Sequence, residues 1–411
     1  LETNKAKAEH GGIKIKAAGE EVIAFENEDT KGFCDFTSRE GKFASNLDGA
    51  QTRFPLNKYI SSMADYRWDM NAKTIDVKPG KSLGGDLPEF ISVKQGQDSL
   101  RFESQLASFD LITAVLDIEQ VPHIDIADSR VFPDLEKVTV RRDAKMDTLF
   151  NSKILANKLD KFHNVFNCTT RIDGFFNMQA SGNYIYTNKQ RLKQEMYFDS
   201  IIAKRLDSSV VGYGYVSDTQ NFTMDTKLHY KGGAEITSKE KPIHFKGYIK
   251  PEHVFTTYYP SMWIKFEQKV DPANVIVNVS DPRGYNRFQL DIGLYYAMDS
   301  AHVYPSIFGR KRRRTDPDIV IDTGILYFNH ELNSFMIGSE DKLLGSSRTG
   351  NIMRIDEGEK TIYTEGKFDF DFNFMDGFDL NTAGNASLKE GDSTFVLNMA
   401  FGLEFDLPKS I

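Results

Sequence analysis

The stretch from Phe109 to Ile118 is the sequence feature that most constrains the fold. Phe109-Asp110-Leu111 is followed, after four residues, by Leu116-Asp117-Ile118. In both arms apolar residues alternate with a polar one, which is the side-chain period of a β-strand. Four residues are enough for a tight connection between two strands. The stretch therefore predicts a strand, a short turn and a returning strand.

Similar arms recur elsewhere in the chain. Trp68-Asp69-Met70 and Ile75-Asp76-Val77 repeat the pattern 41 residues earlier, position for position. Weaker copies begin at Phe328-Asn329 and at Ile355-Asp356. A period near 40 residues is typical of stacked supersecondary units, none of which buries its apolar face alone. The alternative is that hairpins of similar length arise by chance in an all-β chain.

The composition favours sheets over helices. The 411 residues include 31 Phe and 17 Tyr, and aromatic side chains fit the pleated, half-buried surface of a sheet. The predicted fold class is all-β: an elongated stack of short strands and hairpins, of the β-solenoid or open β-jelly-roll type, with a more regular antiparallel sheet at the C-terminal end. With so many strands, the unpaired N–H and C=O groups at the sheet edges must be covered by stacked units or removed by closure of the sheet.

Four regions are expected along the chain. Residues 1–135 form a β-repeat region with the two units of about 41 residues, and residues 136–307 continue it as a β-rich region. Residues 308–318 are a basic loop or linker, and residues 319–411 a C-terminal antiparallel β region. Within the second region, residues 145–162 have apolar residues near helical spacing but strand-like flanks. Strands are favoured there, and a helix is the alternative.

Five consecutive basic residues, from Arg310 to Arg314, interrupt the pattern. Like charges in a row repel one another and have nothing to bury, which predicts an exposed loop or linker. A nuclear signal or a nucleic-acid patch is the sharper alternative, but no aromatic platform for stacking bases surrounds the stretch. The whole chain has 51 basic and 59 acidic residues, a net charge of −8. This balance argues against wholesale nucleic-acid binding, so we expect no nucleic-acid partner.

Several features bear on the cellular compartment. Cys34 and Cys168 lie far apart in the sequence, and both a single disulfide and two isolated thiols remain open. No run of about 18 apolar residues occurs, so no transmembrane helix is predicted. The chain begins Leu-Glu-Thr-Asn, without Met or an apolar signal segment, which favours a fragment of a large exported protein. The expected location is extracytoplasmic: the periplasm, the outer membrane or the cell surface.

The C-terminal hundred residues contain the most regular strand patterns. Residues 367–374 alternate Phe with Asp or Asn, and residues 395–407 carry an apolar residue at every odd position. One face of each predicted strand is therefore apolar. Because burying one Phe side chain is worth about 1.5 to 3 kcal/mol, we expect this face to meet a core, a partner or lipid.

Paired acids are the first candidates for chemistry. Asp69 with Asp76, and Asp110 with Asp117, occupy matching places in the two units. Two carboxylates that face each other across a hairpin at a suitable separation are the catalytic residues of a glycosidase. Capping of the turn is the favoured interpretation, because an Asp side chain binds nearby backbone N–H groups and recurs readily in successive units.

A calcium loop is the second candidate. Asp369, Asp371 and Asn373, with Asp376 nearby, resemble the start of such a loop. The loop needs Gly at its sixth position for the sharp turn, and Phe374 stands there. The alternation with Phe favours a solvated strand face.

The third candidate is the cluster of His123, Asp125 and Asp128, which offers metal ligands or an acid–base pair. His123 and Asp125 share one face of a strand, but no further ligand is apparent. Outward-facing polar residues, with Ile124 and Ile126 pointing inward, are the favoured interpretation. No GxSxG, HExxH, P-loop or dinucleotide motif occurs either. We therefore assign no catalytic, cofactor-binding or metal-binding residue and expect no cofactor.

The unit of an aromatic residue, Asp, five residues, and two aliphatic residues one position apart resembles a known repeat. Trp68-Asp69 with Ile75 and Val77, and Phe109-Asp110 with Leu116 and Ile118, resemble the repeat of the OstA/LptA-type lipopolysaccharide-transport proteins. The resemblance implies a stacked, open β-jelly-roll in the periplasm with an apolar interior. The many Phe and Tyr strands with Asp, Asn and Gly turns also look like large exported envelope proteins of the Bacteroidota.

Three functional hypotheses follow. The first is a non-enzymatic envelope component, an elongated β-rich scaffold or surface-interaction module of a larger exported protein. Its expected partners are other envelope proteins in a complex, with lipid and glycan as further candidates. The second is a carbohydrate-active enzyme or glycan-binding module on a β-helix or sandwich. The third is a segment of an outer-membrane β-barrel, suggested by the long C-terminal alternation.

Overall fold

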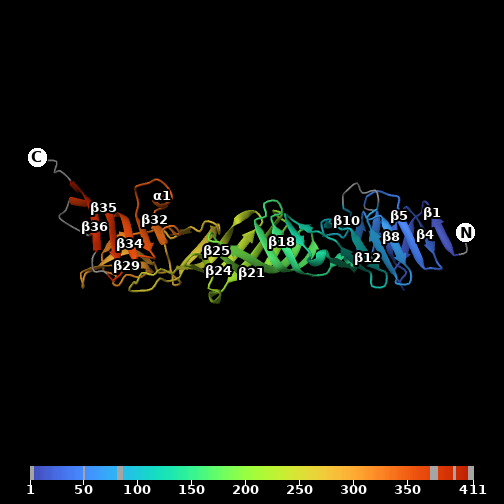
Figure 1. Cartoon of the computed structure of the whole chain (residues 1–411), viewed down its shortest axis with the longest axis horizontal. Coiled ribbons are helices and arrows are strands. Elements are labelled where there is room, and N and C mark those ends of the chain that lie inside the picture. Colours follow the sequence, from blue (N-terminus) through green and yellow to red (C-terminus); the bar gives the residue numbers. More distant parts are fainter. Residues whose placement is uncertain (1–3, 50, 81–86, 371–377, 392–394, 406–411) are drawn as a thin grey trace. The chain divides into compact units, whose positions relative to one another are not determined.

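The computed structural model describes residues 4–49, 51–80, 87–370, 378–391 and 395–405. Nearly all regular elements in these residues are β-strands, which confirms the predicted all-β class (Figure 1). The single α-helix of the described residues, α1 (Glu340–Leu343), has four residues. Three 3₁₀ turns complete the elements: Asp134–Glu136, Arg142–Ala144 and Asp218–Gln220.

The chain forms two compact units. Unit 1 contains residues 1–185, 195–214 and 235–241, and unit 2 contains residues 186–194, 215–234 and 242–411. The first sheet of unit 1 has nine strands, in the order β1 (Lys5–Ala8), β4 (Thr30–Asp35), β5 (Glu40–Ser45), β8 (Asp65–Asp69), β9 (Thr74–Lys78), β12 (Leu106–Asp110), β13 (Val115–Glu119), β16 (Val138–Arg141) and β17 (Lys145–Met146).

A second antiparallel sheet runs through unit 1. Its strands pair in the order β2 (Ile13–Lys16), β3 (Ile23–Asn27), β6 (Thr52–Phe54), β7 (Tyr59–Ser61), β10 (Glu89–Ser92), β11 (Arg101–Glu103), β14 (Ile124–Ile126), β15 (Ser129–Phe132), β18 (Leu149–Ala156), β19 (His163–Gly174) and β20 (Asn177–Thr187). From β2 to β15, successive hairpins therefore go alternately to the two sheets. The strands predicted within residues 145–162 are confirmed as β17 and β18.

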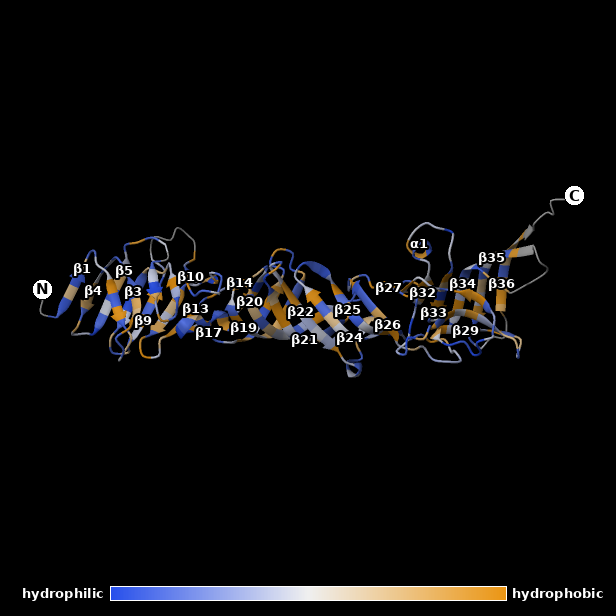
Figure 2. Cartoon of the chain, turned by 180° about the vertical axis from the view of Figure 1, so that it is seen from behind, coloured by the Kyte–Doolittle hydropathy of each residue, from blue (hydrophilic) through white to orange (hydrophobic). Residues whose placement is uncertain are grey.

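The core of unit 1 lies between these two sheets and is rich in aromatic residues. Phe25 of the second sheet packs edge-on against Tyr66 of the first, with ring centroids 5.1 Å apart. Phe54 of the second sheet packs in the same way against Phe109 of the first, at 5.4 Å. The two phenylalanines of the second sheet and Phe109 have no exposed surface. The alternation read from the sequence thus places one face of each strand in the interior, and Figure 2 shows hydrophobic and hydrophilic residues interleaved along the strands.

Four-residue turns with a shared geometry join many of the strands. Asp69 accepts backbone hydrogen bonds at Oδ1 from Asn71 (2.9 Å) and Ala72 (2.8 Å). Asp110 does the same for the N–H groups of residues 112 and 113, at 2.7 and 2.9 Å. The predicted capping role of Asp69 and Asp110 is confirmed. Among the described residues, three further four-residue turns have this cap, at Asp35, Asn329 and Asp356, and Asn157 forms it in the longer turn between β18 and β19. The sequence pattern did not reveal the cap at Asp35.

Three further antiparallel hairpins follow β20 in the sequence. Unit 2 also contains two other sheets. The hairpin pairs are β21 (Lys193–Lys204) with β22 (Ser209–Val216), β23 (Thr223–Asp225) with β24 (Leu228–Thr237), and β25 (Glu240–Pro251) with β26 (Ile264–Val270). The seven-stranded sheet follows the order β27 (Val277–Asn278), β31 (Ile325–Asn329), β32 (Ser334–Gly338), β33 (Ile352–Asp356), β34 (Thr361–Lys367), β35 (Phe378–Lys389) and β36 (Phe395–Phe405). The three-stranded sheet has β28 (Asp291–Ala297) between β29 (His302–Gly309) and β30 (Asp318–Ile321). The antiparallel C-terminal sheet is confirmed, and the alternation from residue 395 forms β36. The alternation over residues 367–374 does not form one strand: β34 ends at Lys367, residues 368–370 are irregular, and residues 371–374 lie outside the described residues.

Candidate functional site

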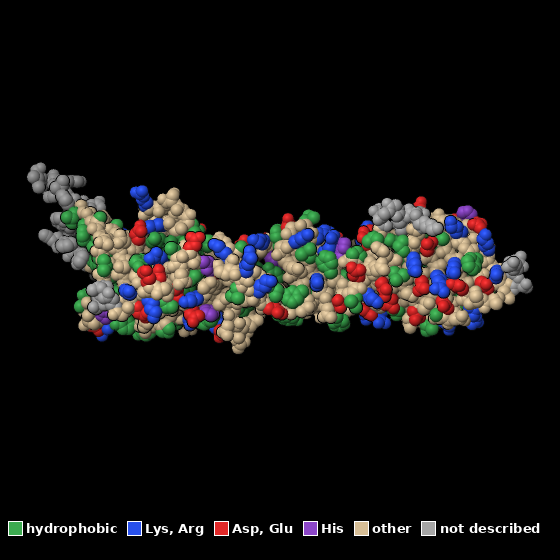
Figure 3. All heavy atoms as spheres, in the orientation of Figure 1, with side chains coloured by type: hydrophobic (Ala, Val, Ile, Leu, Met, Phe, Trp, Pro, Cys, Tyr) green, Lys and Arg blue, Asp and Glu red, His purple; other side chains and the backbone are tan. Residues whose placement is uncertain are grey.

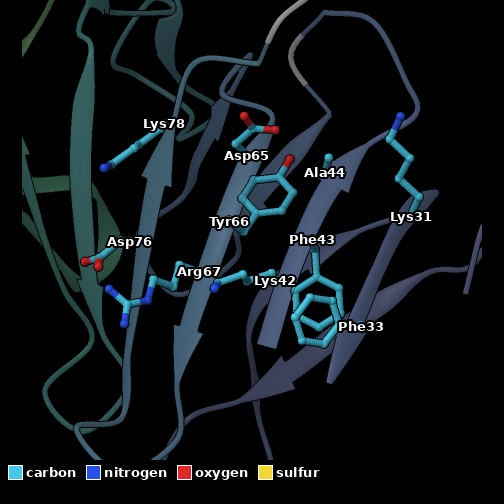
Figure 4. A pocket seen from close by; sticks show the side chains of 10 residues that line it. All are labelled: Lys31, Phe33, Lys42, Phe43, Ala44, Asp65, Tyr66, Arg67, Asp76 and Lys78. Atoms are coloured by element: carbon cyan, nitrogen blue, oxygen red, sulfur yellow. The ribbon is translucent and has the colours of Figure 1, made fainter. Parts of the chain in front are cut away.

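A hollow of about 420 Å³ lies on the outer face of the first sheet of unit 1 (Figure 4). Strand pairing brings eight of its ten lining residues together in two rows across β4, β5, β8 and β9, and Phe43 and Tyr66 complete the lining. One row places Phe33, Lys42, Arg67 and Asp76 side by side, and the next row places Lys31, Ala44, Asp65 and Lys78 side by side. Because the side-chain period of a strand is two, residues two apart on each strand face the same side and line one surface.

The charges of the hollow are partly paired. Glu40 accepts a hydrogen bond from Arg67 Nε at 2.7 Å, and Lys42 Nζ lies 3.5 Å from the same carboxylate oxygen. The bond to Arg67 is the first cause that lowers the pKa of Glu40. Figure 4 shows the guanidinium of Arg67 directed toward its cross-strand neighbour Asp76, and Asp76 Oδ1 also accepts a hydrogen bond of 3.1 Å from the hydroxyl of Ser108.

The hollow keeps unpaired groups as well. No carboxylate of the described residues forms an ion pair with Lys31 or Lys78, and the ring of Phe33 is 42% exposed. An exposed aromatic ring and ammonium groups on one surface suit a ligand that has both apolar and negatively charged parts. In the strand register Asp65 stands opposite Lys78, and Asp76 stands opposite Arg67. Figure 3 shows basic and acidic side chains interleaved over the surface of unit 1.

The paired acids of the sequence prediction do not meet across their hairpins. The register places Thr74 opposite Asp69 and Arg67 opposite Asp76. In the next hairpin Val115 stands opposite Asp110, and Asp117 accepts a hydrogen bond of 2.6 Å from Thr139. Asp69 and Asp110 therefore cap turns as predicted, whereas the capping predicted for Asp76 and Asp117 is wrong. Both of these lie within strands and accept cross-strand hydrogen bonds from hydroxyl groups.

His123 and Asp125 belong to an ion-pair network at the second sheet, while Asp128 forms a separate ion pair with Lys239 at 3.2 Å. Asp125 accepts a hydrogen bond of 2.9 Å from Arg130 and lies 3.2 Å from Lys158 Nζ, while His123 Nε2 is 3.8 Å away. Asp128 also accepts a 2.7 Å bond from the hydroxyl of Ser238. Burial raises the pKa of Asp125, but the hydrogen bonds and charges of Arg130 and Lys158 lower it by more, so the net shift of this pKa is downward. The interpretation as polar residues beside inward Ile124 and Ile126 agrees with the complete burial of both isoleucines.

The calcium candidate is only partly described. Asp369 lies beyond β34, where its backbone N–H donates to Ile319 O at 2.8 Å, whereas Asp371, Asn373 and Asp376 lie outside the described residues. The two cysteines are free thiols: Cys34 is half-buried and Cys168 is buried. Burial raises the pKa of the Cys168 thiol to about 12.

The basic stretch forms a loop between β29 and β30, but the expectation that it has nothing to bury is wrong. Lys311 pairs with Asp318, and both Arg312 and Arg313 pair with Asp299. The Arg312 side chain is only 19% exposed. Its hydrogen bond to Asp299 is the largest influence that lowers the pKa of that carboxyl, to about 2. Three of the five cations are thus paired with acids, and the loop packs against the three-stranded sheet, where Arg312 N–H donates to the hydroxyl of Tyr304.

The sequence patterns missed an aromatic cluster in unit 2. Lys231 Nζ lies 4.2 Å from the ring centroid of Trp263 and 5.2 Å from that of Tyr285. The ring of Tyr248 packs against that of Tyr285, with centroids 4.1 Å apart and the ring planes tilted by 31°. Three separate hairpins or loops supply these residues, so only the folded register brings them together. Lys231 also pairs with Asp218 at 3.1 Å and is itself 14% exposed, so the cluster satisfies its own cation.

Within the described residues, no group of three or more His, Cys, Asp or Glu side chains is arranged to hold a metal ion. The helices of these residues also lack the length and apolarity that a bilayer crossing requires, in agreement with the sequence prediction. Comparisons with family models, with curated proteins and with solved structures gave no match to this chain.

Proposed function

We propose that the protein is a non-enzymatic scaffold and interaction module of the cell envelope, and part of a larger exported assembly. The observation that carries this proposal is how the fold employs its carboxylates. Asp69 and Asp110 bind turn N–H groups, and Asp125 is shared between two cations. General acid–base chemistry needs a carboxylate free to reach the reacting atom, whereas these groups hold the fold together.

The arrangement of unit 1 supports the scaffold role. Hairpins alternate between two sheets that enclose an apolar interior, as the resemblance to OstA/LptA-type proteins implies. Phe25, Phe54, Phe90 and Phe109 are fully buried there by the protein's own side chains. Because these side chains fill the interior, the outer faces and edges of the sheets are left as the surfaces for partners. This favours a structural role over the carriage of lipid inside unit 1.

Turnover measurements test the proposal. The full chain is incubated with a panel of envelope glycans, beside the variants Asp110→Asn and Asp125→Asn. We expect no product from any of the three proteins. Release of a glycan product by the native chain that either variant abolishes would overturn the proposal and favour the carbohydrate-active alternative.

Glycan binding without turnover is the second candidate, and the hollow of unit 1 favours it. Phe33 offers an apolar ring face, while Lys31 and Lys78 suit the carboxylate groups of an acidic oligosaccharide. Calorimetry with acidic and neutral oligosaccharides measures this. Phe33→Ala and Lys78→Gln should weaken binding of the acidic ligand.

A matched control is available for this second test. Phe36 lies in the turn next to the same hairpin, is 54% exposed, and does not line the hollow. Phe36→Ala should leave the binding constant unchanged. Equal loss in Phe33→Ala and Phe36→Ala, or equal binding of neutral and acidic ligands, would argue against the hollow as the site.

A further inference from the structure

Strand β36 forms one edge of the seven-stranded sheet in unit 2. It pairs with β35 in a continuous antiparallel register, from Phe395 opposite Leu388 to Phe405 opposite Phe378. In the described part of the chain no strand pairs with its other side. Along that side, the N–H and C=O groups of every second residue form no strand ladder with the described residues, which is the arrangement that a further strand can extend.

This edge lacks the features that usually prevent pairing with other chains. Lysines, prolines and short length protect an exposed strand edge. The edge strand β1 has four residues with two lysines, β29 contains Pro305, and β27 has two residues. By contrast, β36 has eleven residues and contains no Lys, Arg or Pro.

One face of β36 is apolar and incompletely covered. Leu397 and Met399 are half-buried, whereas Phe401 and Leu403 are 63% and 66% exposed. Because these four residues are two apart, they share a face, and hydrophobic side chains are visible at the surface of the C-terminal strands in Figure 3. A strand that covers this edge must bring apolar residues to the same face.

We propose that β36 pairs antiparallel with β36 of a second copy of this chain, about a two-fold axis at Ala400. Ala400 is the midpoint of the strand, so this register pairs all its positions. It sets Leu397 opposite Leu403 of the partner subunit and Met399 opposite Phe401 of the partner subunit. The apolar faces of both strands then form one continuous surface across the joined sheets.

Other registers fit less well. If the register slips by one residue, the apolar face of one copy lies on the same side of the joined sheet as the polar face of the other. A slip by two residues keeps the faces matched but leaves positions unpaired at the ends. In the two-fold register Glu404, which is the only charged residue of the strand, stands opposite Val396 of the partner subunit and not opposite Glu404 of the partner subunit. The inference concerns assembly through unit 2 and does not depend on the proposed function.

A charge pair at the axis tests this register. Ala400 is exposed, so the variants Ala400→Glu and Ala400→Lys add a charge without disturbing the core. At the axis each new charge faces its own copy, and like charges directly opposite weaken strand pairing. Sedimentation velocity of the full chain should show dimers for the native protein and about fivefold weaker dimerisation for each variant. An equimolar mixture of the two variants should restore the dimer.

The control variant is Ala383→Glu. Ala383 is also exposed and pairs directly with Ala400 on β35, one strand further from the axis. Its distance from the same residue of the partner subunit would be about 14 Å, because strands are about 4.8 Å apart. Salt screens charges at that separation, so this variant should dimerise like the native chain.

The outcomes are distinct. Dimers that weaken in both Ala400 variants, persist in Ala383→Glu and return in the mixture support the proposal. A native chain that is monomeric at every concentration overturns it, since the edge is then covered by residues of the same chain or by a different partner. Dimers that neither Ala400 variant weakens overturn it too, because they form through another surface.

Discussion

The side-chain amide of Asn57 donates a hydrogen bond of 2.9 Å to the backbone carbonyl of Val140, 83 residues away in the sequence. Asn57 lies in the turn between β6 and β7 of the second sheet, whereas Val140 belongs to β16 of the first. The same nitrogen also donates to Ala114 O at 2.9 Å. Asn57 has no exposed surface, so one buried side chain joins the two sheets of unit 1.

We expect Asn57→Ala to destabilise unit 1 by about 2 to 4 kcal/mol, because two buried carbonyls lose their donor and each unsatisfied group costs about 1 to 3 kcal/mol. Urea unfolding followed by the fluorescence of Trp68, in a Trp263→Phe background, measures this free energy. Asn71→Ala is the control, since Asn71 is exposed and accepts only a 3.3 Å bond from Arg39. A surface change of this kind should stay within about 0.5 kcal/mol. Equal effects of the two substitutions would contradict the role assigned to Asn57.

The turn at Asp110 distinguishes a structural carboxylate from a catalytic one. Asp110 Oδ1 accepts two backbone hydrogen bonds, and an Asn side chain presents the same acceptor oxygen. We expect Asp110→Asn to keep most of the stability of unit 1 and Asp110→Ala to lose about 1 kcal/mol, the typical value of such a bond. Thermal unfolding of both variants checks this. If the Asn variant were as unstable as the Ala variant, the carboxylate charge would matter and the capping role would be incomplete.

Asp322 should make the stability of unit 2 depend on pH. Its side chain is buried, neither oxygen accepts a hydrogen bond from the described residues, and burial raises its pKa to about 8. Lys342 opposes this shift only in part. The folded state then binds a proton that the unfolded state has already released, so this group lowers stability as pH rises from about 4 to about 8.

The variant Asp322→Asn removes this dependence. We expect it to gain stability over the native chain as pH rises, by up to about 1.4 kcal/mol per pH unit, with no further gain above pH 8. Urea midpoints between pH 4.5 and 8.5, followed by Trp263 in a Trp68→Phe background, give the difference between the two proteins. Taking the difference cancels the contribution of His253, whose lowered pKa acts in the opposite direction. A difference that does not change with pH would show that Asp322 is ionised in the folded state.

The sequence was sufficient where the side-chain period is strict. Phe109 and Leu116 alternate with polar neighbours, and the structure pairs them directly across the predicted hairpin. Local turn chemistry was also legible, because an Asp cap needs only the two N–H groups that follow it. The basic stretch was misjudged for the same local reason: Asp316 and Asp318 were visible beside it, but Asp299 reaches it only through the pairing of β28 with β29.

The candidate site could not be predicted in this way. Lys31 and Lys78 are 47 residues apart, and only the register of four strands places them in one row. Asn57 stands in a Phe-Pro-Leu-Asn turn whose sequence gives no sign of the two carbonyls it serves. Long-range pairing fixes both, and the period of two on each strand does not specify which strands become neighbours.

The last prediction concerns His163 in unit 1, whose response to pH should be opposite to that of Asp322. His163 is fully buried, and its Nε2 lies 2.9 Å from Glu240 O. Burial is the first cause that lowers the pKa of its imidazole. Below about pH 6.5 an unfolded histidine takes up a proton that the folded one resists, so unit 1 should lose stability as pH falls from about 7 to 5. His163→Gln keeps an N–H donor for Glu240 O without titrating, and should flatten this part of the profile. Urea midpoints followed by Trp68 at pH 5, 6 and 7 compare the variant with the native chain, and an unchanged acid response in His163→Gln would assign the effect to another group of unit 1, such as His123, whose pKa burial also lowers.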